Sequence, residues 1–122
     1  DPAAPVTEGR ARGADQRTTA FLQPARGLLD QAGVWTGLAP HAVPLQVMRI
    51  VDAGGADGRP RVSRDFEAAE LGPAPFGWNL PNWLLRREML ARIAALDGAG
   101  FRAGVGFDGM VARDARAIVR LT

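Results

Sequence analysis

The sequence predicts a mixed α/β fold, α+β in character, because helical and strand-like stretches follow one another as helix, strands, helix, strands. Its length of 122 residues is that of one ordinary domain. Its composition, 47% hydrophobic and 23% charged, is typical of a globular protein. No apolar run approaches the roughly 18 residues that a transmembrane helix needs, and no basic-then-apolar leader opens the chain. We therefore expect neither a transmembrane helix nor a signal peptide here.

The first part of the chain is expected to be a loop followed by a short helix. Residues 1–16 are rich in proline and glycine and poor in large apolar side chains, which predicts a mobile loop. Pro24 suits the first turn of a helix, and Gly33 suits the position just after its end. Leu28 and Leu29 would form the buried side of this helix.

Five stretches are expected to form strands, because they are rich in β-branched residues or alternate between apolar and small or polar residues. They are residues 45–52, 61–66, 76–80, 101–107 and 115–121. Loops are expected before the first of them, at 36–44, and between the second and third, at 67–75, and the glycine-rich stretch 53–60 carries two turn signals.

The second helix is the best-supported element of the sequence. Asn82, directly after Pro81, is a good N-cap residue. Apolar residues then recur at helical spacing on one face, at Leu85, Met89, Ile93 and Leu96. The Asp97-Gly98 pair is expected to end the helix.

The available residue types exclude several kinds of chemistry. The chain has no cysteine, no tyrosine and one histidine, so disulfides, thiolate metal sites and a cysteine nucleophile are excluded. His41 has no partner in the sequence and is not expected to be catalytic. Asp65, Glu67 and Glu70 match no metal-ligand spacing. The GVGFDG stretch at 104–109 runs into strand-like sequence, so it is not expected to be a dinucleotide-binding turn.

The charge distribution argues against nucleic-acid binding. Fifteen basic residues, all of them arginine, against thirteen acidic residues give a net charge of only +2. The arginines are scattered, whereas a DNA-binding protein usually shows a clustered basic patch.

An anion site is the main functional hypothesis from the residues themselves. Arg86 and Arg87 lie in the first turns of the second helix, where the helix dipole disfavours cations by about 0.3–1 kcal/mol each. A bound anion would relieve this cost. Alternatively, both arginines are solvated and one pairs with Glu88 or Asp97. Arg17 is either a phosphate contact or a surface charge, and Asn82 either lines a ligand crevice or only caps its helix.

Four stretches, taken in order, carry a resemblance to a known family. They are ADQRTTAFLQPARGLLDQAGVW at 14–35, LAPHAVPLQVMRIVDAGG at 38–55, DFEAAELG at 65–72 and FGWNLPNWLLRREMLARIAAL at 76–96. In them the chain resembles the flavin-dependent aromatic hydroxylases of ubiquinone biosynthesis, of the 2-polyprenylphenol hydroxylase type. The wider group is the para-hydroxybenzoate-hydroxylase-like class of FAD monooxygenases. The likeness covers nearly all of residues 14–122.

The resemblance implies a cofactor-dependent activity. NAD(P)H would reduce FAD, and a C4a-hydroperoxyflavin would hydroxylate the ring of a polyprenylated phenol. The matching positions imply an FAD contact for Arg17, a contact of Asn82 with the ribityl–phosphate region, and a further contact for Arg86. No catalytic residue and no metal ligand is implied.

The resemblance also implies how the chain is organised. The family's opening GxGxxG turn and its later Asp-Gly and Gly-Asp motifs do not occur here, so 17–122 is similar to an internal segment. Residues 17–44 and 82–122 would lie on the cofactor-domain side of a two-domain FAD/NAD(P)-binding fold, and 45–81 in its substrate-side sheet.

Several expectations about behaviour follow from this reading. The isolated segment is expected to be inactive and to bind FAD weakly, and its open strands to self-associate. A cytoplasmic location is expected, with contact at the inner membrane left open, and no nucleic-acid partner. The alternative is a small non-enzymatic module that binds an anion or a protein.

Overall fold

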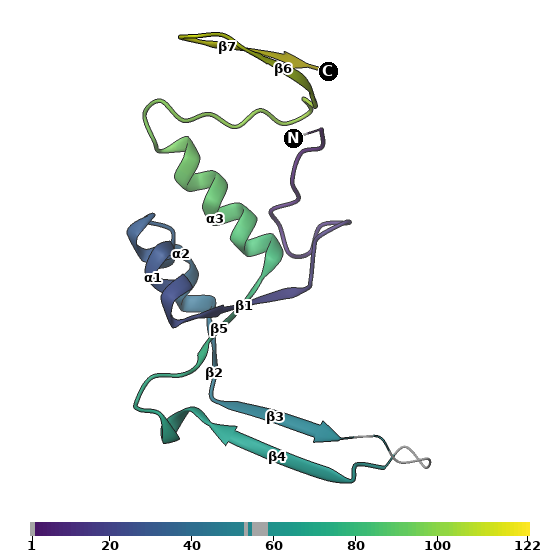
Figure 1. Cartoon of the computed structure of the whole chain (residues 1–122), viewed down its shortest axis with the longest axis vertical. Helices are drawn as coiled ribbons and strands as arrows, with labels where there is room; N and C mark the ends of the chain where they lie inside the picture. The colour runs from purple at the N-terminus through teal and green to yellow at the C-terminus, as the bar shows by residue number, and fades with distance from the viewer. Residues whose placement is uncertain (1, 53, 55–58) are drawn as a thin grey trace. The chain divides into compact units, whose positions relative to one another are not determined.

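The structure is a computed structural model that describes residues 2–52, 54 and 59–122. The elements follow the chain as β1 (Thr18–Leu22), α1 (Gln23–Gln31), α2 (Trp35–Leu38), the 3₁₀ turn η1 (Ala39–His41), β2 (Val43–Leu45), β3 (Val47–Asp52), β4 (Val62–Glu67), the 3₁₀ turn η2 (Ala68–Glu70), β5 (Gly77–Pro81), α3 (Asn82–Ala94), β6 (Phe107–Ala112) and β7 (Ala117–Leu121) (Figure 1). Helices and antiparallel sheets together confirm the mixed α/β fold. The turns expected within 53–60 lie outside the described residues, which there include only 54, 59 and 60.

The chain divides into two compact units. One consists of Arg17–Asn82, called here the 17–82 unit. The other combines Asp1–Gln16 with Trp83–Thr122 and is called here the terminal unit. Each unit is described separately below.

The 17–82 unit is built on a three-stranded antiparallel sheet in the order β1-β5-β2 (Figure 1). Leu80 of the central strand β5 and Leu38 at the end of α2 are fully buried. The edge of the Trp35 indole meets the Trp78 ring, with 5.5 Å between ring centroids and 68° between ring planes. The buried apolar residues of this unit are Leu29, Val34, Trp35, Leu38, Ala68 and Leu80. Its core therefore lies around the helical segment that follows β1 and the middle of β5.

The first helix ends as its sequence predicts. Gly33 adopts the left-handed conformation, with φ of 72°. The N–H of Gly33 donates to the backbone carbonyl of Asp30, and the N–H of Val34 donates to that of Leu29, both at 2.9 Å. This pair of bonds is the Schellman pattern. The expectation that Leu28 is buried with Leu29 is wrong, because Leu29 is 8% exposed but Leu28 is 67% exposed. A helix this short presents a single buried stripe, and only Leu29 lies on it.

The prediction of a loop at 36–44 is also wrong. This stretch contains most of α2, the turn η1 and most of the strand β2. Pro40 does not interrupt the chain there, because it occupies the first turn of η1, where proline is tolerated. Strand β2 pairs with β5 from Val43 to Leu45. Likewise, the loop expected at 67–75 contains the short turn η2.

Strands β3 and β4 form an antiparallel hairpin with two different faces (Figure 1). The register pairs Met48 with Phe66 and Ile50 with Arg64, so these residues share one largely apolar face. Arg49 pairs with Asp65 on the opposite face. Their side chains form a two-pronged ion pair with both N–O distances at 2.7 Å.

Helix α3 begins at Asn82, at the expected boundary. The expectation that the Asp97-Gly98 pair ends it is wrong, because the helix already ends at Ala94. The expected buried face is only partly confirmed. Leu85 is buried beside Leu84, but Met89 is 40% exposed and Leu96 is 41% exposed. Burial is thus concentrated in the first turn of α3, and Leu96 lies beyond the end of the helix.

The segment 2–16 contains no helix or strand, as expected of a loop, and it contacts the start of α3. The Trp83 N–H donates to the Asp15 carbonyl at 3.3 Å. A Cβ added to Gly9 would lie 2.6 Å from Cε2 of Trp83, so the Gly9 backbone lies directly against the indole. The Gln16 side-chain amide also donates to the Gly9 carbonyl.

The prediction of a strand at 101–107 is wrong over most of its length. Residues 101–106 form no strand, and β6 begins at Phe107. Gly104 has a φ of 71°, which turns the chain and breaks the alternation that the sequence suggested. The expected last strand is confirmed as β7, which pairs antiparallel with β6.

Candidate cofactor-contact site

Arg17 and Asn82, which are 65 positions apart in sequence, meet at the end of the β1–β5 ladder. The Asn82 backbone N–H donates to the Arg17 carbonyl at 2.9 Å. In the β1–β5 register Thr18 lies opposite Pro81, and this bond extends the pairing by one residue on each strand. The antiparallel pairing of β1 with β5 therefore places two of the three predicted cofactor contacts next to each other.

Thr19 is part of the same end of the ladder. Its Oγ1 donates a hydrogen bond to Oδ1 of Asn82 at 2.6 Å. In the register Thr19 lies opposite Leu80, and Arg17 precedes it by two residues, just before β1 begins. We refer to Arg17, Thr19 and Asn82 as the β1–β5 end site.

Thr19 was not singled out from the sequence. The signal that could have identified it is its position two residues after Arg17 in a β-branched run, which favours a strand with both side chains on one face.

Arg86, the third predicted contact, lies in the terminal unit. Its Nη2 lies 3.2 Å from Oδ2 of Asp15. The Asp15 side chain is 11% exposed and that of Arg86 is 43% exposed, so the carboxylate is the more enclosed partner. The sequence suggested Glu88 or Asp97 as the partner of one of the two arginines. Asp15 could not be anticipated because it is 71 positions away.

Arg87 behaves as the alternative interpretation proposed. Its Nε lies 2.8 Å from Oε1 of the adjacent Glu88. Its guanidinium carbon also lies 5.4 Å from the centroid of the Trp83 ring, within cation–π range. These two contacts account for Arg87 as a surface residue of α3.

The donors of the β1–β5 end site suit an anionic or polyhydroxylated ligand. A guanidinium offers five N–H donors and a carboxamide offers two, while neither residue can act as a nucleophile at neutral pH. The three residues of the site include no carboxylate. This arrangement can bind and orient a ligand, and it offers no acid–base pair for catalysis.

The acidic residues considered for a metal site do not form one. Across residues 2–52, 54 and 59–122, no group of three potential ligands is close enough to hold a metal ion. Asp65 instead pairs with Arg49. The hydrogen bond from Arg49 lowers the pKa of Asp65 below its ordinary value of 3.8. His41 lies exposed in η1.

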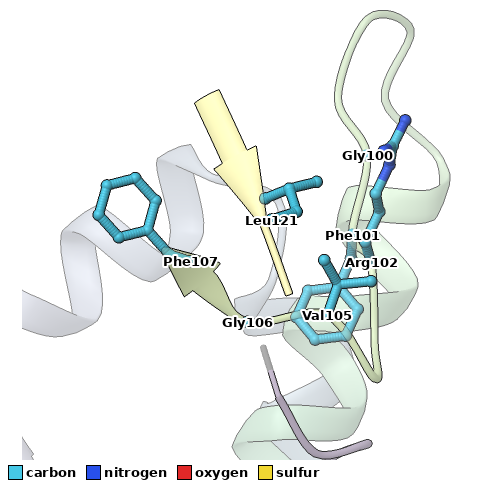
Figure 2. Close-up of a pocket in the computed structure, with 7 residues that line it drawn as sticks. All are labelled: Gly100, Phe101, Arg102, Val105, Gly106, Phe107 and Leu121. Carbon is cyan, nitrogen blue, oxygen red and sulfur yellow. The ribbon is translucent and has the colours of Figure 1, made fainter. Parts of the chain in front are cut away.

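A surface pocket of the terminal unit lies elsewhere (Figure 2). It is lined by Gly100, Phe101, Arg102, Val105, Gly106, Phe107 and Leu121. Figure 2 shows the Phe107 ring directed away from the Val105 side chain. Arg102 is the one charged residue of this lining. The pocket includes none of the predicted cofactor contacts.

The geometry thus places donor side chains of Arg17, Thr19 and Asn82 together at a strand-to-helix junction of a mixed α/β chain. No family model matches the chain. Among curated proteins, ubiquinone hydroxylase UbiL of Rhodospirillum rubrum is 33% identical to it over 89 residues. The match covers 73% of this chain and 19% of the relative, so it spans about a fifth of that protein's length. This distant, partial likeness supports a relationship to the ubiquinone-biosynthesis hydroxylases.

No helix within the described part of the chain is long and apolar enough to cross a membrane.

Proposed function

We propose that this chain is a segment of an FAD-dependent monooxygenase that hydroxylates the aromatic ring of a polyprenylated phenol in ubiquinone biosynthesis, with NAD(P)H as reductant. The observation that carries the proposal is the 33% identity over 89 residues to a protein named as a ubiquinone hydroxylase. The geometry adds independent support, because Arg17 and Asn82, which the family resemblance selects, lie together at one end of the β1–β5 ladder.

The residues present fit FAD by their chemistry. The FAD pyrophosphate is anionic and its ribityl chain carries hydroxyl groups, and both are served by guanidinium and carboxamide donors. The β1–β5 end site contains no acidic side chain that would repel the phosphates. When bound, FAD supplies the oxygen-activating redox chemistry that these side chains lack.

The roles of the chain's own residues are binding and orientation. Arg17 would neutralise phosphate charge, and charge-assisted hydrogen bonds of this kind contribute about 1.5–3 kcal/mol. Asn82 would orient the ribityl–phosphate region from the first turn of α3, where the helix dipole favours negative charge. Arg86, on the same helix, would add positive charge while Asp15 holds its guanidinium in place.

The distribution of apolar surface supports the segment interpretation. Large apolar side chains of β3 and β6, such as Ile50, Met110 and Phe107, are more than half exposed. The match to UbiL covers only 19% of that protein, which leaves ample chain in a protein of that size to cover such surfaces. In this proposal, 17–44 and 82–122 lie on the cofactor-domain side and 45–81 belongs to the substrate-side sheet.

FAD binding by the full-length protein tests the proposal. We expect FAD to co-purify with the wild-type protein. We expect Arg17→Ala and Asn82→Ala each to raise the Kd for FAD by about 10-fold, as the loss of one good polar contact implies. Flavin fluorescence in a titration of the apoprotein measures this Kd.

The matched control is Arg113→Ala, an exposed arginine at the β6–β7 turn, which should leave the Kd unchanged. Restoration of ubiquinone in a strain that lacks its own hydroxylase tests the activity. A full-length protein that binds no FAD and restores no ubiquinone would favour the non-enzymatic binding module instead.

A further inference from the structure

We propose that Thr19 is a positioning residue for Asn82, whose hydroxyl sets which end of the Asn82 carboxamide faces the FAD phosphates and ribityl chain. This inference rests on the proposed function and extends it to a residue that the sequence comparison did not select. It depends on one contact, the 2.6 Å hydrogen bond from Oγ1 of Thr19 to Oδ1 of Asn82.

The position of Thr19 is fixed by backbone pairing. Thr19 is held opposite Leu80 in the β1–β5 register, and Leu80 is fully buried. Asn82 is held by the bond from its own N–H to the Arg17 carbonyl. A diagonal neighbour across an antiparallel pair is within reach of a side chain. The hydroxyl and the carboxamide are therefore brought together by two anchored backbones.

The hydrogen bond selects one of two orientations of the carboxamide. An amide can rotate by half a turn and exchange its oxygen for its nitrogen with little change in shape. With Oδ1 directed at Thr19, Nδ2 is directed away from Thr19. A phosphate oxygen needs a donor, which Nδ2 supplies, whereas Oδ1 in the same place would repel it, and a ribityl hydroxyl accepts a bond from Nδ2 equally well. The hydroxyl thus favours the orientation that suits the ligand.

The test compares three variants of the full-length protein in titrations of the apoprotein with FAD. Thr19→Val keeps the shape but removes the hydroxyl, and we expect it to raise the Kd for FAD by about 3- to 10-fold. Thr19→Ser keeps the hydroxyl and should bind FAD with the same Kd as the wild-type protein. Thr18→Val, on the opposite face of β1, is the matched control and should change nothing. If valine is not tolerated at position 19, Thr19→Ala gives the same comparison.

A double-mutant cycle separates positioning from a structural effect. In an Asn82→Ala background, Thr19→Val should change the Kd for FAD by less than about 2-fold, because the amide that Thr19 orients is gone. An equal loss in both backgrounds would overturn the inference, as would a Thr19→Val protein that binds FAD like wild type. A wild-type protein that binds no FAD would instead overturn the proposed function, and the two failures are thereby distinguished.

Discussion

Gly77 of β5 lies directly against the backbone of β1. A Cβ at this position would lie 2.3 Å from the Phe21 carbonyl oxygen and 2.9 Å from Cα of Leu22. Both are backbone atoms held in the sheet, so they cannot move aside as a flexible side chain would. The register that creates this contact is the one that places Arg17 beside Asn82.

The first prediction at the residue scale concerns this glycine. Gly77→Ala should lower the free energy of unfolding by about 3 kcal/mol, because the β1–β5 pair must separate to admit the methyl group. Gly27→Ala is the matched control. Gly27 lies in α1, and a Cβ added there would meet no atom within 4 Å. The alanine substitution should therefore stabilise the protein by about 0.5–1 kcal/mol. Denaturant unfolding measures both, and equal effects would contradict the account.

Residue-scale features were predictable from the sequence only where they depend on near neighbours. Arg17 and Asn82 could be selected because they occur in motifs, and Gly33 because a helix end demands its conformation. Thr19 and Asp15 could not, because their partners are 63 and 71 positions away and are brought close only by the folded chain.

At the scale of elements, an ion pair on one face joins the two strands of the β3–β4 hairpin. Arg49 and Asp65 pair across it, while Arg64 lies on the other face with its guanidinium carbon 5.1 Å from the Phe66 ring centroid. The hydrogen bond raises the pKa of Arg49 and lowers that of Asp65. A carboxyl with a lowered pKa adds stability above its ordinary range and loses this contribution as the pH falls through the lowered value.

The element-scale prediction follows from this pair. Arg49→Gln should raise the pKa of Asp65 back towards its ordinary value of 3.8, because the main cause of the shift is removed. Arg64→Gln should leave it unchanged, since Arg64 lies on the opposite face. An acid titration followed by the NMR signal of the Asp65 carboxyl carbon measures the midpoint. The same midpoint in wild type and Arg49→Gln would refute the assignment.

Elements with strong local signals were predictable, and those that depend on a partner were not. Helix α1 carries Pro24 in its first turn and Gly33 just after its end, and Asn82 marks the start of α3, so these boundaries were predictable; α3 ends at Ala94, before the expected Asp97-Gly98 pair. Strand β2 has only three residues and was expected to be loop, because its pairing with β5 is what makes it a strand. Alternation at 101–106 suggested a strand, but the left-handed Gly104 prevents one.

At the scale of the whole molecule, buried and exposed apolar residues are unevenly distributed. Among the described residues, the terminal unit buries Leu84 and Leu85. Its β6–β7 hairpin is apolar on both faces. Met110 and Val119 share one face, and Val111 and Ile118 share the other. All four are at least 40% exposed, and such surfaces usually mark interfaces.

The whole-molecule prediction is that the 122-residue chain associates with itself through this hairpin. Met110→Lys should shift the chain towards monomer, because a charge on an apolar face opposes its burial. The control is Leu71→Lys, at a residue of the 17–82 unit that is 83% exposed. This substitution should leave the self-association unchanged. Sedimentation velocity over a range of concentrations measures the change. A wild-type chain that remains monomeric throughout would contradict the prediction.

The edge-on meeting of Trp35 and Trp78 has an optical consequence. Two indoles 5.5 Å apart and inclined at 68° couple their electronic transitions. The coupling should give the ultraviolet circular dichroism of the chain a paired positive and negative band. Trp35→Phe or Trp78→Phe should each abolish this couplet, whereas Trp83→Phe should preserve it. Because both coupled indoles belong to the 17–82 unit, the signal would report the melting of that unit alone.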